Sequence, residues 1–397
     1  MLGAQVLASV VINRKYGIEA VGIYALVLAI SQIVITGISQ PFSSLIRRDL
    51  VLLKKETAIL YVKNVNYLRF LNLILILIIT LILISFFSEK INNIKPFLIL
   101  MLISKGFEML NDTYFVTYQS LSKYKRYAIL KTVYSLLMCF SIAFIYFNNV
   151  NIELLYYLQV IVGIAYFIFN YLLFEKLMPY ERLKKGLNLF LSQDRKHLLL
   201  ETWPMMVNSL VFQGSSKLNA IIIFHFISAK DLGIFSILVM FSNIFGGVGN
   251  SLGIVLISRF TILIQESVKQ FKIFFKKSML LFFGLGVVLF ICYIFSLPLL
   301  VNIFKLKMPG LFKLNLVIGA AIPFLFATGC IGNIFFILKK QIVGVYISII
   351  VLLFNVLLYS CFAFSFALEG TGYAYLITSA FQFFIILFWA SKILKKR

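Results

Sequence analysis

The chain carries three charged residues inside one apolar stretch: Lys105, Glu108 and Asp112, all within residues 97–119. On a helix these positions fall within about 60° of one another, so the side chains form one stripe. A charge at the centre of a membrane helix costs roughly 2.5–3.5 kcal/mol and usually faces protein or water. Glu108 can pair with Lys105, which leaves Asp112 without a partner on its own helix. The stripe is either a self-neutralised structural group or the wall of a hydrated cavity, with Glu108 and Asp112 as candidates for proton or cation coupling.

Other polar side chains in the apolar stretches are candidates for contact with a substrate. These candidates are Gln32, Asn208, Lys217 and Asn243. Lys217 stands about two turns from a span end, so snorkelling to the interface is an alternative for it. Small polar residues also hold membrane helices together, so packing alone is the alternative for the amides.

Arginines close to span ends form a second group of candidates. Arg14 follows the first apolar segment, and Arg48 ends the apolar stretch 20–44 with a counterpart at Arg259. Each side chain could meet an anionic head group, or could serve only as an interfacial anchor.

Apolar stretches of membrane-spanning length must position these residues. A spanning helix needs about 20 mostly apolar residues, and a single segment in lipid must be helical because its backbone groups have no other partners. Eleven spans are predicted, at residues 20–44, 70–87, 97–119, 128–147, 152–174, 199–224, 232–257, 278–295, 311–338, 342–366 and 373–390. Residues 1–13 are apolar but too short to cross alone.

Charge and composition set the class and the orientation. The chain is 61% hydrophobic with a net charge of +23, and 25 of its 37 basic residues fall on alternate loops or at the C-terminus. Basic loops lie in the cytoplasm, which explains the charge without nucleic acid and predicts a cytoplasmic C-terminus. Motifs for a nucleotide, a hydrolase or a metal centre are not found in the sequence, so we expect no catalytic residues, cofactor or metal.

An internal repeat predicts two lobes. At an offset of 211 residues, the segment starting at Gly22 resembles the one starting at Gly233, and that starting at Ser31 resembles the one starting at Ser242. Six spans plus six in parallel orientation predict two six-helix lobes around a central cavity. The expected division is residues 1–174 for the N-terminal lobe, 175–198 for an amphipathic cytoplasmic linker and 199–397 for the C-terminal lobe. The register also predicts a truncated first helix, from a mis-assigned start or a deletion.

Short motifs resemble those of Wzx-type O-antigen flippases. The first half carries Arg14-x-x-Gly17-x-x-x-x-Gly22-x-Tyr24 and Leu45-Ile46-x-Arg48; the second half carries Thr202-Trp203-Pro204, Lys217-Leu218-Asn219 and Asp231-Leu232-Gly233-Ile234-Phe235-Ser236. Many members of that family have Asp where Asn219 stands, so a carboxylate role is not expected there.

The resemblance implies a transporter of the multidrug/oligosaccharidyl-lipid/polysaccharide exporter superfamily, not an enzyme. Its expected substrate is an oligosaccharide repeat unit of O-antigen or capsule on undecaprenyl pyrophosphate, moved from the cytoplasmic to the periplasmic leaflet of the bacterial inner membrane. Lys105, Lys217, Arg14 and Arg48 become candidates for the anionic group. Membrane lipids, a polysaccharide polymerase and a chain-length regulator are the implied partners.

Three alternatives remain. A drug/cation antiporter of the same superfamily should favour acidic and aromatic cavity groups, whereas this chain has only 14 acidic residues. A Wzy-type O-antigen polymerase should carry a large periplasmic loop, but the outer loops predicted here are short, the longest near residues 296–310. A structural scaffold would not need charges such as Lys105 and Asp112 at membrane depth.

Overall fold

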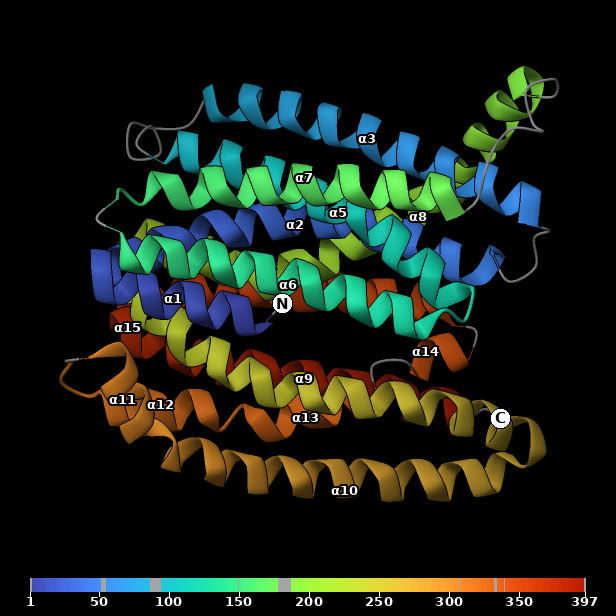
Figure 1. Ribbon diagram of the computed structural model, residues 1–397. Coiled ribbons are helices and arrows are strands. Elements are labelled where there is room, and N and C mark those ends of the chain that lie inside the picture. The colour runs from blue at the N-terminus through green and yellow to red at the C-terminus, as the bar shows by residue number, and fades with distance from the viewer. Residues whose placement is uncertain are drawn as a thin grey trace. The chain divides into compact units, whose positions relative to one another are not determined.

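All the regular secondary structure that the computed structural model describes is α-helical (Figure 1). The described residues are 2–50, 55–85, 94–148, 150–177, 187–306, 308–331, 334–338 and 340–395. Eight helical stretches among them are long and apolar enough to cross a membrane. The chain is an all-α polytopic membrane protein, which confirms the fold class predicted from hydropathy.

The helices follow the predicted spans in order. In the first half they are α1 (Leu2–Tyr16), α2 (Ile18–Asp49), α3 (Lys55–Ser85), α5 (Lys95–Ser120), α6 (Tyr124–Phe147) and α7 (Glu153–Leu177). In the second half they are α8 (Leu187–Phe226), α9 (Ala229–Glu266), α10 (Val268–Phe295), α11 (Leu297–Phe304), α12 (Leu311–Gly319), α13 (Ile322–Ile331), α14 (Ile334–Ile337) and α15 (Gln341–Lys395). Part of the predicted linker 175–198 lies outside the described residues.

Several helices run well beyond the apolar windows that predict them. Helix α3 begins at Lys55, whereas the predicted span begins at Phe70. Hydropathy detects only the part that meets lipid, but the helical hydrogen-bond pattern continues through polar residues as long as the backbone allows it. The extension places Arg69 inside a helix and not at its edge.

Two breaks interrupt otherwise continuous helical stretches. Ala367, with φ 47° and ψ −132°, is non-helical and divides α15 into the last two predicted spans. A turn at residues 320–321 separates α12 from α13, so Pro323 stands in the first turn of α13, where its missing N–H has no intrahelical acceptor to lose. Pro41, by contrast, lies inside the continuous helix α2.

The described chain forms two compact units. Unit 1 consists mainly of residues 3–11 and 26–217, and unit 2 of residues 12–25 and 218–397. Helices α1, α2 and α8 therefore contribute residues to both units. The division into lobes at 174 and 199, and the cavity between lobes, stay predictions.

Each unit has one central helical element. In unit 1, α5 packs against α3, α6 and α7; in unit 2, α13 packs against α9, α10 and α15 (Figure 1). Aromatic side chains fill both cores, among them Phe115 and Tyr134 in unit 1 and Phe271 and Phe326 in unit 2.

A helix start recurs at the offset seen in the sequence. Helix α2 begins at Ile18 and α9 at Ala229, 211 residues apart. By this register the elements corresponding to α5 are α12 and α13.

The N-terminal turns of α2 and α9 meet at a pair of glycines in unit 2. A Cβ on Gly22 would lie 1.8 Å from the Ala229 carbonyl oxygen, and one on Gly233 would lie 2.3 Å from the Ile18 carbonyl oxygen. These four residues are related by the same offset, so the contact is reciprocal. Only glycine permits so close a backbone approach.

Candidate functional site

The centre of α5 carries the predicted charged stripe. Lys105 Nζ lies 2.6 Å from Glu108 Oε2, and the two side chains are 18% and 24% exposed. The i, i+3 spacing on a helix brings these side chains together, as the sequence predicts. Lys217 on α8, in the same compact unit, lies near enough to Lys105 for their charges to interact. Two cationic side chains of unit 1 therefore lie in the same neighbourhood.

Asp112, one turn beyond Glu108, is held by a residue of another helix. The hydroxyl of Ser43 on α2 donates a hydrogen bond to Asp112 Oδ2 at 2.7 Å. The sequence provided no partner on α5 itself, and the partner comes from α2 instead. Pairing across helices depends on their packing, which the spacing of residues along a single helix does not reveal.

Arg69 on α3 is the polar residue that sequence reasoning missed as a site. Its side chain is fully buried and its guanidinium donates four hydrogen bonds. The acceptors are the Met109 carbonyl (3.2 Å), Thr113 Oγ1 (2.6 Å), the Ser39 carbonyl (2.7 Å) and Ser43 Oγ (2.6 Å). Arg69 thus links α3 to both α2 and α5. The sequence does carry a signal for Arg69: it directly precedes the long apolar run that begins at Phe70. If the helix begins before that run, the arginine lies within the helix and its charge needs polar partners.

The remaining candidate residues differ in burial and belong to different units. Gln32 on α2 and Asn208 on α8 are half-buried in unit 1, while Asn243 on α9 in unit 2 is exposed. The Tyr375 hydroxyl donates to Asn243 Oδ1 at 3.3 Å. An amide with this partner can still present its NH₂ group to a ligand.

The two candidate arginines differ in what the structure describes. Arg14, exposed at the end of α1, donates from Nε to the Ile303 carbonyl of α11 at 3.0 Å, and the neighbouring Asn13 donates to the Phe304 carbonyl. These donors satisfy carbonyls at the C-terminal end of a short helix, and the bond to Ile303 uses the Nε of Arg14. The side chain of Arg48 lies outside the described residues. The proposed roles of all these residues stay predictions.

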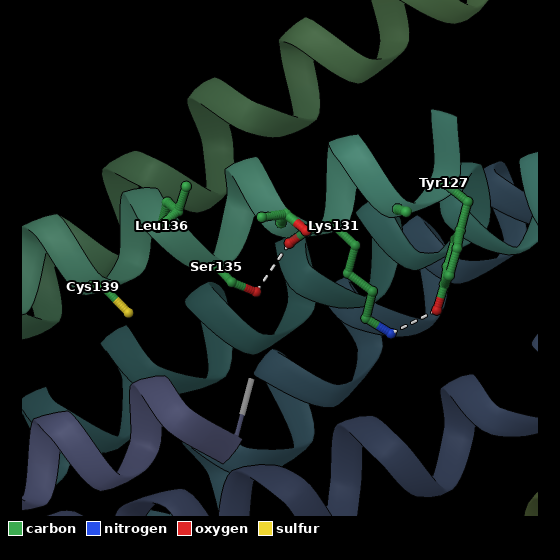
Figure 2. A pocket seen from close by; sticks show the side chains of 7 residues that line it. Tyr127, Lys131, Ser135, Leu136 and Cys139 are labelled. Carbon is green, nitrogen blue, oxygen red and sulfur yellow. Dashed lines mark hydrogen bonds between the residues drawn. The ribbon is translucent and has the colours of Figure 1, made fainter. Parts of the chain in front are cut away.

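A groove of about 360 Å³ runs along α6 (Figure 2). Its lining residues are Tyr127, Ala128, Lys131, Thr132, Ser135, Leu136 and Cys139. Lys131 Nζ donates to the Tyr127 hydroxyl at 3.0 Å, and Ser135 Oγ donates to the Lys131 carbonyl, as Figure 2 shows. All of the lining belongs to one helix and none of it to the predicted site, so the polar groups of this groove are largely satisfied by α6 itself.

Solved structures share this arrangement of helices over the whole chain. A multidrug resistance MATE family transporter of the MOP superfamily aligns with a TM-score of 0.76 at 14% identity, covering 100% of this chain and 96% of that one. The lipid II flippase MurJ aligns with a TM-score of 0.77 at 14% identity, covering 100% and 87%. The chain has the fold of these transporters. The Vibrio cholerae MATE transporter VcmN also aligns, with a TM-score of 0.65 at 15% identity over 99% and 92%.

Comparisons by sequence give no such likeness. No family model and no curated protein matches the chain. The MOP-type fold therefore rests on the arrangement of helices, and the chemistry of the site must be argued from this chain's own residues.

Proposed function

We propose that the chain is a flippase that moves an oligosaccharide on undecaprenyl pyrophosphate, an O-antigen or capsule repeat unit, from the cytoplasmic to the periplasmic leaflet of a bacterial inner membrane. The observation that carries the proposal is the neighbourhood of Lys105 and Lys217 in a MOP-type fold. A lysine at membrane depth is costly unless it faces polar groups or water, and two such cations suit a pyrophosphate.

The remaining candidates fit the other parts of such a substrate. Sugar hydroxyls need amide and hydroxyl partners, which Gln32, Asn208 and Asn243 would supply, while Arg14 and Arg48 would meet anionic groups near the span ends. The lipid tail stays in the bilayer. Glu108 and Asp112 are the candidates for ion coupling, and we propose that the two predicted lobes rock to give alternating access. We place the C-terminus in the cytoplasm on the distribution of basic residues.

A drug/cation antiporter is the second candidate, because MATE transporters share the fold. A cationic drug requires anionic or aromatic partners. The chain has 37 basic residues and only 14 acidic ones, and near the centre of α5 the charge of Lys217 adds to that of Lys105. The flippase is therefore favoured.

The test is the fate of the lipid-linked glycan in the host bacterium. A strain that lacks the gene should accumulate undecaprenyl-linked glycan in the cytoplasmic leaflet and lose surface polysaccharide, and the wild-type gene should restore both. Lys105→Ala and Lys217→Ala should lower export about tenfold or more, because a hydrogen bond to a charged group contributes about 1.5–3 kcal/mol.

Lys131→Ala is the matched control, because Lys131 is also a half-buried lysine of unit 1 but lines the groove along α6, outside the predicted site, where it donates to the Tyr127 hydroxyl. It should leave export within twofold of wild type. Normal surface polysaccharide in the deletion strain, together with new sensitivity to cationic drugs, would overturn the proposal in favour of the antiporter.

A further inference from the structure

Helix α11 ends in a conformation that usually selects glycine. Its last residue is Phe304, and Lys305 follows in the left-handed region with φ 48° and ψ 41°. The N–H groups of Lys305 and Leu306 both donate to the Val301 carbonyl, as at the ends of many helices where glycine takes this place. The Cβ of a lysine strains this conformation, so the backbone does not explain the residue type. Strain of this kind gathers at functional sites.

The end of α1 is fixed against this turn. Arg14 Nε donates to the Ile303 carbonyl at 3.0 Å, and Asn13 donates to the Phe304 carbonyl. All of these residues belong to unit 2. Two cationic side chains that are far apart in the sequence, those of Arg14 and Lys305, therefore lie at one junction.

The charges of this junction remain available to a ligand. Arg14 and Lys305 are both exposed, and neither forms an ion pair with a carboxylate that the structure describes. The bond to Ile303 uses Nε, so Nη1 and Nη2 of Arg14 still carry four N–H donors. The predicted outer loops hold eight of the 37 basic residues, and a basic residue there opposes the orientation of the chain. A pair of cations at this end therefore indicates an anionic ligand.

We propose that Arg14 and Lys305 bind the pyrophosphate of a polyprenyl carrier at the outer end of unit 2, as its last contact before release into the outer leaflet. A guanidinium binds phosphate oxygens in pairs, and an ammonium adds a mobile point charge. Two cations match a pyrophosphate better than a phospholipid head group, which carries one phosphate. The identity of the carrier rests on the proposed function; the binding of a pyrophosphate at this junction does not.

The experiment labels the purified full-length protein in detergent micelles with a light-activated probe. The probe is farnesyl pyrophosphate with a diazirine in its isoprenoid chain, and adducts on residues 9–20 and 297–312 are quantified by peptide mass spectrometry. An excess of inorganic pyrophosphate should suppress these adducts. Lys305→Gly should lower them at least fivefold, and this variant should fold at least as well as wild type because glycine relieves the left-handed backbone. Arg14→Gln should lower them by a similar factor.

Lys313→Met and Asn13→Ala are the matched controls, and both should keep the labelling within twofold of wild type. Lys313 is another cation of unit 2, but it already has Glu369 as its ion-pair partner, and Asn13 belongs to the junction without carrying a charge. Wild-type labelling of Lys305→Gly would overturn the proposal. A fivefold loss in Asn13→Ala would also overturn it, since the packing of the junction and not its charge would then govern labelling.

A second probe separates the two sources of a phosphate group at this surface. A diazirine analogue of phosphatidylglycerol should label the same segments at least threefold less than the pyrophosphate probe. Equal labelling by both probes, lost in the same two variants, would overturn the proposal in favour of a phospholipid head-group site. Because this readout needs no transport, a deletion strain with normal surface polysaccharide would refute the proposed function and leave this site in place.

Discussion

The two units hold their central elements by different chemistry. In unit 1, α5 is tied by polar bonds: Arg69 reaches two of its residues, and Asn111 donates to the Gly163 carbonyl of α7 at 3.3 Å while accepting from Asn170 at 2.8 Å. In unit 2, α13 is approached closely by glycines of its neighbours. A Cβ on Gly249 would lie 2.9 Å from the Phe326 carbonyl oxygen, and one on Gly286 would lie 2.6 Å from Pro323 Cα.

This difference is instructive because the repeat makes α5 and α12–α13 counterparts. The 211-residue offset pairs Asp112 with Pro323 and Lys105 with Leu316. Lipid supplies little hydrophobic drive between membrane helices, so close packing of small residues and interhelical hydrogen bonds must hold them together. Unit 1 adds polar bonds to close packing, since a Cβ on Gly106 of α5 would also lie 2.2 Å from Leu73 Cδ1 of α3. Among the described residues, α5 carries charged side chains at its centre and α13 carries none.

The largest effect is expected from removing the polar centre of unit 1. Arg69→Met deletes four hydrogen bonds from a charged donor, so the free energy of unfolding should fall by about 3–5 kcal/mol, because each hydrogen bond to a charged group contributes roughly 1.5–3 kcal/mol. The change is measured as a fall in the thermal or denaturant midpoint of the detergent-purified protein.

Arg47→Met is the control. Arg47 lies on α2 one turn after Ser43 and is exposed, so its replacement should change the free energy of unfolding by no more than about 0.5 kcal/mol. If both variants unfolded at the same midpoint as wild type, the hydrogen bonds of Arg69 would not stabilise α5. The proposed difference between α5 and α13 would then be wrong.

A smaller effect is expected in unit 2, where packing replaces polar bonds. Gly286→Ala places a methyl group against the backbone of Pro323 and should destabilise by about 1–3 kcal/mol, as overpacking of a core does. Gly284→Ala on the same helix has open space around its Cβ and should be neutral or slightly stabilising, since alanine favours the helix by roughly 0.5–1 kcal/mol. Equal stability of these two variants would show that α13 does not depend on close approach.

The smallest effect is expected at the exposed ion pair of unit 2. Lys313 Nζ lies 2.6 Å from Glu369 Oε2, with both side chains largely exposed. Lys313→Met should lower the free energy of unfolding less than either change above, because exposed ion pairs contribute little, and the difference from wild type should shrink in salt, which screens exposed pairs. A loss as large as that of Arg69→Met would mean that unit 2 also depends on charge.

Much of the fold was predictable because lipid restricts the choice of structure. Each apolar stretch had to be helical, and the spans predicted from residues 20 and 232 lie within helices that begin at Ile18 and Ala229. The pairing of Lys105 with Glu108 was also predictable, since it lies within one helix. The break at Ala367 was not, because the span boundaries left open whether a loop or a kink joins the last two spans.

The surroundings of the stripe could not be predicted for a different reason. The partner of Asp112 comes from α2 and the buried cation from α3, and a single sequence does not say which faces of separate helices meet. Arg69 also fell just outside a hydropathy window, although its helix starts 14 residues earlier in the chain.

The reciprocal glycine contact between α2 and α9 has a consequence for how mutations at the two positions combine. Each glycine faces the first turn of the other helix, at the Ala229 and the Ile18 carbonyl, so a methyl group at either one pushes the same two backbones apart. Once the first substitution has opened the crossing, a second at the partner glycine meets less resistance, and the pair should cost less than the sum of the single changes. Natural or engineered variation at Gly22 is therefore tied to that at Gly233, although 211 residues separate them.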